Sequence, residues 1–279
     1  MDLSFRTFNC HSAFNCHSER SEGIYSMKCL IIAAGYATRL YPLTENFPKP
    51  LLKVGDKAIL DWLIEDLDKT GLIDEYVVVS NHKFAPIFED WASVRHSRPD
   101  RESRASRDAI RIVDDGTSTN ETRLGAVRDM ELGIKTCDID DDLLVMAGDN
   151  LLSFSLAGFV DYFAAKGTTC IMRYYEPDKS KLHKSGVAEV DAEGRILSME
   201  EKPAEPKANW CCPPFYIIKK EDLPLVSKAI TSGCGVDAPG SFIAWLCQQV
   251  PVHAWEMPGR RFDIGNLESY EEVKKIFSK

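Results

Sequence analysis

Short apolar segments alternate with amphipathic segments through the first two thirds of the chain, and no other feature limits the possible folds so strongly. The segments KCLIIA (28–33), EYVVVS (75–80) and DLLVMAG (142–148) have the composition of strands buried on both faces. Residues 58–71 and 121–135, which lie between them, place apolar side chains at helical spacing. Strands that alternate with helices pair in parallel, and the helices cover both faces of the sheet. The sequence therefore predicts a three-layer α/β fold with a mixed, mostly parallel sheet and a ligand site at the carboxyl ends of the strands.

The second half of the chain has a different pattern. Residues 186–202 alternate apolar and polar side chains around a DAEG turn, which predicts a β-hairpin. We expect this half to form a smaller lobe on the substrate side of the first sheet. The other elements expected there are a helix from Ser155 to about Lys166, strands at 168–175, 215–218 and 251–257, and helices at 240–249 and 266–279.

The composition limits the partners. A formal net charge of −9 is unsuited to nucleic acid, but it leaves small phosphorylated substrates open because these need only a local cluster of cations. No apolar stretch approaches the roughly 20 residues that span a bilayer, so we expect no membrane partner. Nine cysteines without a framework spacing indicate reduced thiols and a cytoplasmic location. The oligomeric state is open, with a homo-oligomer among the options.

Two segments do not fit the regular pattern. Residues 1–26 repeat FNCHS, have no helical or strand period, and are expected to be a disordered extension before Met27. Their Cys-His pairs match no standard zinc spacing, so we expect no metal site there. Residues 93–108 carry arginine at every third position among Ser, Pro and Asp, which favours a solvated loop or insertion over an anion-binding arm.

The segment AAGYATRLYPLTENFPKPLL (33–52) has the features of a phosphate-binding loop. Small residues after a strand let backbone N–H groups approach a triphosphate, and Thr38 can donate to it as well. Arg39 offers a fork of donors that matches phosphate oxygens, while the prolines on both sides of Lys49 restrict its backbone. The segment is neither a Walker loop nor a G-x-G-x-x-G dinucleotide fingerprint, which argues against a nicotinamide-dependent dehydrogenase.

At this point the motifs resemble a known family. GYATRLYPLTENFPKPLL, RLGAV (123–127), AGDN (147–150), the 186–203 segment and FDIGNLESYEEV (262–273) resemble, in order, the motifs of the sugar-phosphate nucleotidylyltransferases. The resemblance extends from Met27 to the C-terminus and is greatest to the glucose-1-phosphate thymidylyltransferase type. It implies a Rossmann-like nucleotidyltransferase domain over residues 27–279, with a sugar-binding lobe.

The resemblance also implies roles for individual residues. Arg39, Lys49 and Lys202 would be catalytic cations that contact the reacting phosphates. Asp149 and Asp263 would hold a Mg²⁺ ion, which prefers carboxylate and phosphate oxygens. The sugar 1-phosphate would bind to Gly186, Glu201 and Lys202. The nucleotide would bind to Ala33, Ala34, Gly35, Tyr36, Ala37, Thr38, Asn81 and Gly125.

The implied reaction is Mg²⁺-dependent transfer of a nucleotidyl group from a nucleoside triphosphate to a sugar 1-phosphate, with release of pyrophosphate. We favour dTTP and glucose 1-phosphate as substrates. One alternative is an enzyme that uses UTP or CTP with another sugar phosphate or with phosphocholine. An alternative of another class is a catalytically silent regulatory subunit, although such a subunit would not need the full set of cations and carboxylates.

Overall fold

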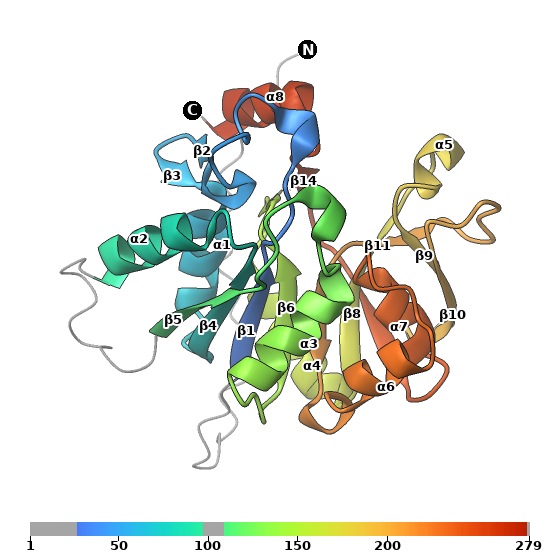
Figure 1. Cartoon of the computed structure of the whole chain (residues 1–279). Helices are drawn as coiled ribbons and strands as arrows, with labels where there is room; N and C mark the ends of the chain where they lie inside the picture. The colour runs from blue at the N-terminus through green and yellow to red at the C-terminus, as the bar shows by residue number, and fades with distance from the viewer. Residues whose placement is uncertain (1–26, 97–108, 278–279) are drawn as a thin grey trace.

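The computed structural model describes residues 27–96 and 109–277, which form one mixed sheet of ten strands between two layers of helices (Figure 1). The strand order is β10-β9-β11-β8-β12-β6-β1-β4-β5, and β13 pairs with β8 beside this path. The strands are β1 (Met27–Ile32), β4 (Ile73–Ser80), β5 (Ala109–Asp114), β6 (Leu143–Ala147), β8 (Thr169–Tyr175), β9 (Gly186–Val190), β10 (Ile196–Glu201), β11 (Trp210–Cys212), β12 (Phe215–Ile218) and β13 (Val252–Glu256).

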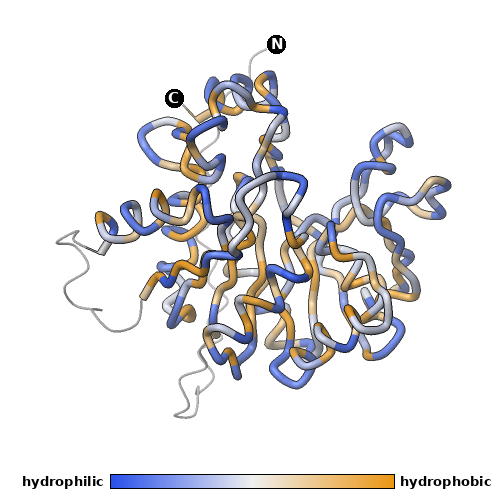
Figure 2. The backbone as a smooth tube through the Cα atoms, viewed as in Figure 1, coloured by the Kyte–Doolittle hydropathy of each residue, from blue (hydrophilic) through white to orange (hydrophobic). Residues whose placement is uncertain are grey.

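Successive strand residues point to opposite faces, and this alternation divides the core in two. On β1, Cys29 and Ile31 face one helix layer, whereas Leu30 faces the other. Apolar side chains accordingly line both sides of the sheet, and polar residues lie mainly on the outer surfaces of the helices (Figure 2). One layer contains α1 (Ile59–Asp68), α2 (Ala85–His96) and α4 (Ala157–Lys166), and the other contains α3 (Ala126–Thr136), α6 (Leu225–Thr231) and α7 (Gly240–Leu246).

Strands β6, β1, β4 and β5 are mutually parallel, so their carboxyl ends meet at one edge of the sheet. The strands end at Ile32, Ser80, Asp114 and Ala147, and the loops that follow them lie side by side. The second half of the sheet is mainly antiparallel and carries the β9–β10 hairpin at its far end. The predicted mixed α/β sheet with an added lobe is confirmed, with its parallel part in the first half.

A small third core supports the loops at this edge. It joins the C-terminal helix α8 to two short antiparallel strand pairs through Leu52, Leu151, Ile264 and Tyr270. Tyr270 also donates from its hydroxyl to the carbonyl of Lys53 at 2.7 Å. The elements are α8 (Leu267–Phe277), the hairpin of β2 (Lys53–Val54) with β3 (Lys57–Ala58), and the two-stranded sheet of β7 (Asn150–Leu152) with β14 (Arg261–Asp263).

The predicted helix at 121–135 begins later than expected, at Ala126. Residues 120–122 form a separate 3₁₀ helix, and Gly125 has a φ of 93°, which no α-helical residue adopts. Within the described residues, no helix has both the length and the apolar character needed to cross a membrane.

The loop predicted for residues 93–108 is wrong for its first part. Residues 93–96 complete α2, and the Arg95 guanidinium is buried against α1, where it donates to Asp61 at 2.5 Å and to Asp68 at 3.0 Å. The apolar period of α2 is weak. Residues 93–96 can nevertheless continue this helix, because two acidic partners on α1 neutralise the buried Arg95. Residues 97–108, like the predicted extension at 1–26, lie outside the described residues.

Candidate active site

The loop after β1 forms one wall of a cavity at the carboxyl edge of the sheet. Ala37 adopts the left-handed conformation with a φ of 49°, and Thr44 holds this turn by donating from Oγ1 to the Ala37 carbonyl at 2.8 Å. No heavy atom lies within 4 Å of a Cβ built on Gly35. The backbone at Gly35 is therefore open to a ligand, and Arg39 lines the same cavity from the 3₁₀ helix that follows.

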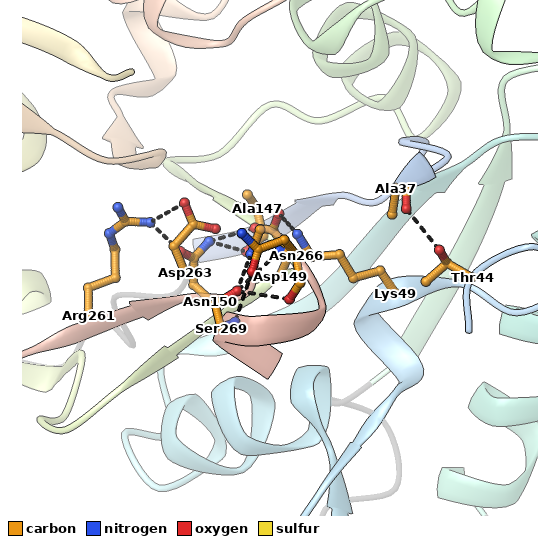
Figure 3. A network of polar contacts seen from close by, with 11 residues as sticks. Ala37, Thr44, Lys49, Ala147, Asp149, Asn150, Arg261, Asp263, Asn266 and Ser269 are labelled. Atoms are coloured by element: carbon orange, nitrogen blue, oxygen red, sulfur yellow. Dashed lines mark hydrogen bonds and ion pairs between the residues drawn. The ribbon is translucent and has the colours of Figure 1, made fainter. Parts of the chain in front are cut away.

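Lys49 and Asp149 form an ion pair on the cavity wall (Figure 3). Lys49 begins a 3₁₀ helix after Pro48, which buries most of its side chain and fixes its direction. Its Nζ donates to Asp149 Oδ2 at 2.6 Å. Asp149 follows β6 directly, so the carboxylate lies where the parallel strands end. The structure thus brings together a predicted catalytic cation and a predicted metal ligand.

Asn150 connects this pair to Arg261 and Asp263. It is 1% exposed, and its Nδ2 donates to Asp149 Oδ1 at 2.7 Å. Its Oδ1 accepts from Arg261 at 2.6 Å, and Arg261 lies 3.6 Å from Asp263 Oδ2. Asp263 on β14 is the register partner of Asn150 on β7. The two predicted metal ligands are therefore held on adjacent backbone segments by one buried amide (Figure 3).

The donor set fits a Mg²⁺ ion that is shared with substrate phosphates. Asp149 and Asp263 supply hard oxygen ligands, and both line the cavity. Among the described residues, no three His, Cys, Asp or Glu side chains gather into a closed metal site. An ion held here would therefore complete its coordination with phosphate or water oxygens, as Mg²⁺ commonly does.

Gly125 lines the same cavity at the point where α3 begins. A Cβ at Gly125 would lie 2.6 Å from the carbonyl oxygen of Val236, so only glycine allows this close approach. The backbone amide of Val127 donates to the same carbonyl at 3.0 Å. Arg123 pairs with Asp237 at 2.8 Å and completes the connection between the two segments.

Several residues predicted to bind the nucleotide do not reach the cavity. Asn81 is fully buried, and its amide donates to the Ala34 carbonyl and accepts from the Phe84 amide, both at 3.0 Å. This satisfies the side chain internally, so Asn81 positions the loop and does not face a base. Tyr36 is also buried and donates to the Thr117 carbonyl at 3.0 Å. Thr38 is exposed and lies outside the cavity lining, whereas Ala33, Ala34, Gly35 and Ala37 belong to it.

A second cavity holds the residues predicted for the sugar phosphate. The Glu201 carboxylate lies over two glycines, since a Cβ built on Gly186 would be 2.9 Å from its Oε2 and one on Gly240 would be 1.9 Å from it. Burial raises the pKa of Glu201, and the positive charge of Lys202 opposes that shift. Lys202 has a φ of 48°, a conformation uncommon outside glycine that is typical of strained functional positions.

The two cavities are continuous. Each has a volume of about 360 Å³, and Pro214, Pro239, Arg261 and Asp263 line both. The predicted phosphate loop and metal ligands thus lie in the first, and Gly186, Glu201 and Lys202 lie in the second. The cleft therefore has two compartments with a shared wall, and the Lys49–Asp149 pair lines one of them while Glu201 and Lys202 line the other.

Comparison with known proteins agrees with this geometry. The family model described as nucleotidyl transferase matches residues 28–279. The chain belongs to the nucleotidyl transferase family. This nucleotidyl transferase is 27% identical over 251 residues to the bifunctional protein GlmU of Methanocaldococcus jannaschii, which covers 89% of this chain and 54% of the relative. It is 30% identical over 192 residues to a glucose-1-phosphate thymidylyltransferase of Mycobacterium tuberculosis, which covers 68% of this chain and 60% of the relative.

A solved structure also shares the fold of this nucleotidyl transferase. UDP-glucose pyrophosphorylase in complex with UDP-glucose superposes with a TM-score of 0.75 at 18% identity, covering 90% of this chain and 98% of the other. The chain spans between 54% and 66% of the length of the first four curated relatives it matches.

Sequence reasoning missed several polar residues of the site in this nucleotidyl transferase. Arg261 could have been found, because it lies two residues before Asp263 on a strand and so faces the same side. Asp129 could have been found as a carboxylate on the buried face of α3, next to Met130. No pattern in the sequence indicates that Arg123 meets Asp237, since these residues are distant along the chain.

Proposed function

We propose that the protein transfers a nucleotidyl group from a nucleoside triphosphate to a sugar 1-phosphate and releases pyrophosphate, with Mg²⁺ as cofactor. The observation that carries the proposal is the continuous cleft, which has the Lys49–Asp149 pair in one compartment and Glu201 with Lys202 in the other. Such a cleft suits a reaction in which two phosphorylated substrates meet.

The mechanism follows from the charges in the cleft. The two substrates repel each other, and Arg39, Lys49 and Lys202 would neutralise their phosphates and align them. An oxygen of the sugar 1-phosphate attacks the α-phosphorus, a new P–O bond forms, and the bond to the β-phosphate breaks. Pyrophosphate leaves with the electron pair. Because the attacking oxygen is already ionised near neutral pH, no general base is required.

The cofactor would be held by Asp149 and Asp263, and when bound it would supply positive charge that stabilises the phosphoryl oxygens. Glu201 would accept hydrogen bonds from sugar hydroxyls while the sugar ring lies against Gly186. The Ala33–Ala37 loop and Gly125 would line the nucleotide. Asn150 would keep both metal ligands in place through its bonds to Asp149 and Arg261.

We favour dTTP and glucose 1-phosphate as the substrate pair. The support is the order of the five motifs and the similarity to a thymidylyltransferase. Similarity to a uridylyltransferase keeps UTP as the next candidate. Phosphocholine with CTP is a further candidate, because Tyr174 and Glu176 also line the second compartment and could contact a cationic head group.

The deciding experiment measures pyrophosphate release from dTTP, UTP, CTP, ATP and GTP, each with several sugar 1-phosphates and with phosphocholine. We expect turnover with a sugar 1-phosphate, its loss on chelation and its recovery on addition of Mg²⁺. Turnover with another pair alone would contradict the dTTP and glucose 1-phosphate assignment. No release with any pair would contradict the enzymatic proposal and favour a silent subunit.

A further inference from the structure

Asp129 is a buried carboxylate without a partner in the cavity wall. It lies in the first turn of α3, is 4% exposed, and lines the first compartment of the cleft. Its Oδ1 is fully buried, and among the described residues no side-chain or backbone donor bonds to it. The carboxylate therefore lacks the hydrogen-bond donor or opposite charge that accompanies nearly every buried charge in folded proteins.

Cations elsewhere in the cleft do not neutralise this group. Lys49 pairs with Asp149, Arg123 pairs with Asp237, and Arg261 bonds to Asn150. Arg39, the fourth cation that lines this compartment, makes no ion pair with Asp129 among the described residues. Burial raises the pKa of Asp129 to about 7, and the negative charge of Asp115 adds to the shift. The protein thus retains an unfavourable carboxylate in the cavity wall. Because Oδ1 is sealed from solvent, Oδ2 is the atom that a compensating ligand in the cavity would bond.

Asp115 is a second carboxylate near Asp129, and one of its oxygens also lacks a hydrogen-bond partner among the described residues. Its Oδ1 accepts from the amide and the hydroxyl of Thr117, at 2.7 and 2.8 Å. Its Oδ2 is buried and has no partner among the described residues. Burial raises the pKa of Asp115 too. Asp115 lies outside the cavity lining, but its negative charge acts on Asp129, and together the two carboxylates make this part of the wall unfavourable for phosphate.

The position of Asp129 indicates which part of a nucleotide it faces. Helix α3 packs over β1, β4 and β5, whereas Asp149 follows β6 on the other side of β1. If the proposed function is correct, the phosphates lie at the cationic Lys49 end. The nucleoside then extends toward Gly125 and Asp129.

We propose that Asp129 is a specificity-determining residue that accepts a hydrogen bond from an N–H or O–H group of the bound nucleoside. The donor is either a nitrogen of the base or a hydroxyl of the sugar. Either donor would supply the hydrogen bond that the Asp129 carboxylate lacks. This inference rests on the proposed function, which gives the orientation of the nucleotide.

The test compares the wild-type protein with Asp129→Asn, which keeps the shape, and Asp129→Leu, which removes hydrogen bonding. Calorimetric binding of the five triphosphates and of their 2′- and 3′-deoxy analogues is measured without acceptor, and pyrophosphate release is measured separately. We expect Asp129→Leu to bind the preferred nucleotide about 10- to 100-fold more weakly. Asp129→Asn, whose amide oxygen can still accept but carries no charge, should lose less, and the KM for the sugar 1-phosphate should be unchanged in both. Asp141→Asn removes the same charge at an exposed position outside the cleft and should change neither quantity.

The analogues separate the two sources of the donor. If the variants lose affinity only for nucleotides with a particular base, the donor belongs to that base. If the difference in affinity between variant and wild type disappears with a 2′- or 3′-deoxy analogue, the donor is the hydroxyl that the analogue lacks. Binding within twofold of wild type for every nucleotide would overturn the proposal. So would an equal loss for all five nucleotides and for both deoxy analogues together with a lower melting temperature, because that result means a structural role. Binding without turnover in the wild-type protein would refute the proposed function and still leave this test decisive.

Discussion

Lys49 and Asp149 lie 100 positions apart in the sequence, yet their side chains form a 2.6 Å ion pair at the edge of the parallel strands. The pair combines a cation that could contact phosphate with a carboxylate that could hold a metal ion. In the free protein each neutralises the other, so both charges are kept in place without leaving a bare charge in a partly buried site.

Loss of the Lys49 charge should reduce turnover. We expect Lys49→Met to lower kcat by about 100-fold or more, because a positioned electrostatic group typically contributes that much. Steady-state pyrophosphate release at saturating substrates measures the change. Lys53→Met removes an exposed lysine of the neighbouring hairpin and is the matched control. A near wild-type kcat for Lys49→Met would show that its role is only structural.

Gly240→Ala should weaken the binding of the sugar 1-phosphate and leave the binding of the nucleotide unchanged. The new Cβ would lie 1.9 Å from Glu201 Oε2, so the flexible Glu201 side chain must move out of the second compartment. We expect the KM for the sugar 1-phosphate to rise about tenfold, the value of one lost hydrogen bond to a charged group, with nucleotide binding unchanged. Gly265→Ala is the control, because nothing lies within 4 Å of its Cβ. Equal kinetic constants in Gly240→Ala and wild type would refute a contact between Glu201 and the sugar.

The stability of the free protein should depend on pH through Asp129. Its pKa is raised from 3.8 to about 7, so the folded state binds more protons than the unfolded chain between these values. Stability from this group therefore falls as pH rises through that window. We expect the unfolding free energy to drop by about 1 kcal/mol between pH 6 and pH 8 on account of Asp129. Urea unfolding at both pH values measures it, and Asp129→Asn should show a smaller drop than wild type. Identical drops would mean that Asp129 titrates normally.

The buried Arg95 should matter for stability and not for activity. Arg95→Met leaves Asp61 and Asp68 without their cation, and breaking a buried pair in this way costs about 3–5 kcal/mol. Urea unfolding measures this loss. Arg111→Met breaks a pair with Glu75 in which the arginine is half exposed, and should cost under about 1 kcal/mol. A similar small loss in both variants would show that the Arg95 pairs contribute little.

The sequence by itself determined the α/β class, the order of the elements and most of the residues after β1 that line the first compartment, because these depend on local periodicity and on short motifs. The motifs also indicated Asp149 and Asp263 as a pair. The hydrogen-bond and ion-pair partners of polar side chains could not be predicted in this way. Asn81 looked like a base contact, yet its amide is used internally, and Arg95 looked solvated although α1 supplies its partners.

Only the tertiary structure decided these points. Asp129 stands out because its carboxylate is buried and unpaired among the described residues, and Asn150 because it connects the segment of Asp149 to that of Arg261. Burial and pairing depend on residues that are distant in sequence, and a local pattern contains no information about which of them will meet. The fold class therefore follows from short-range regularity, whereas the electrostatics of the site arise from long-range contacts.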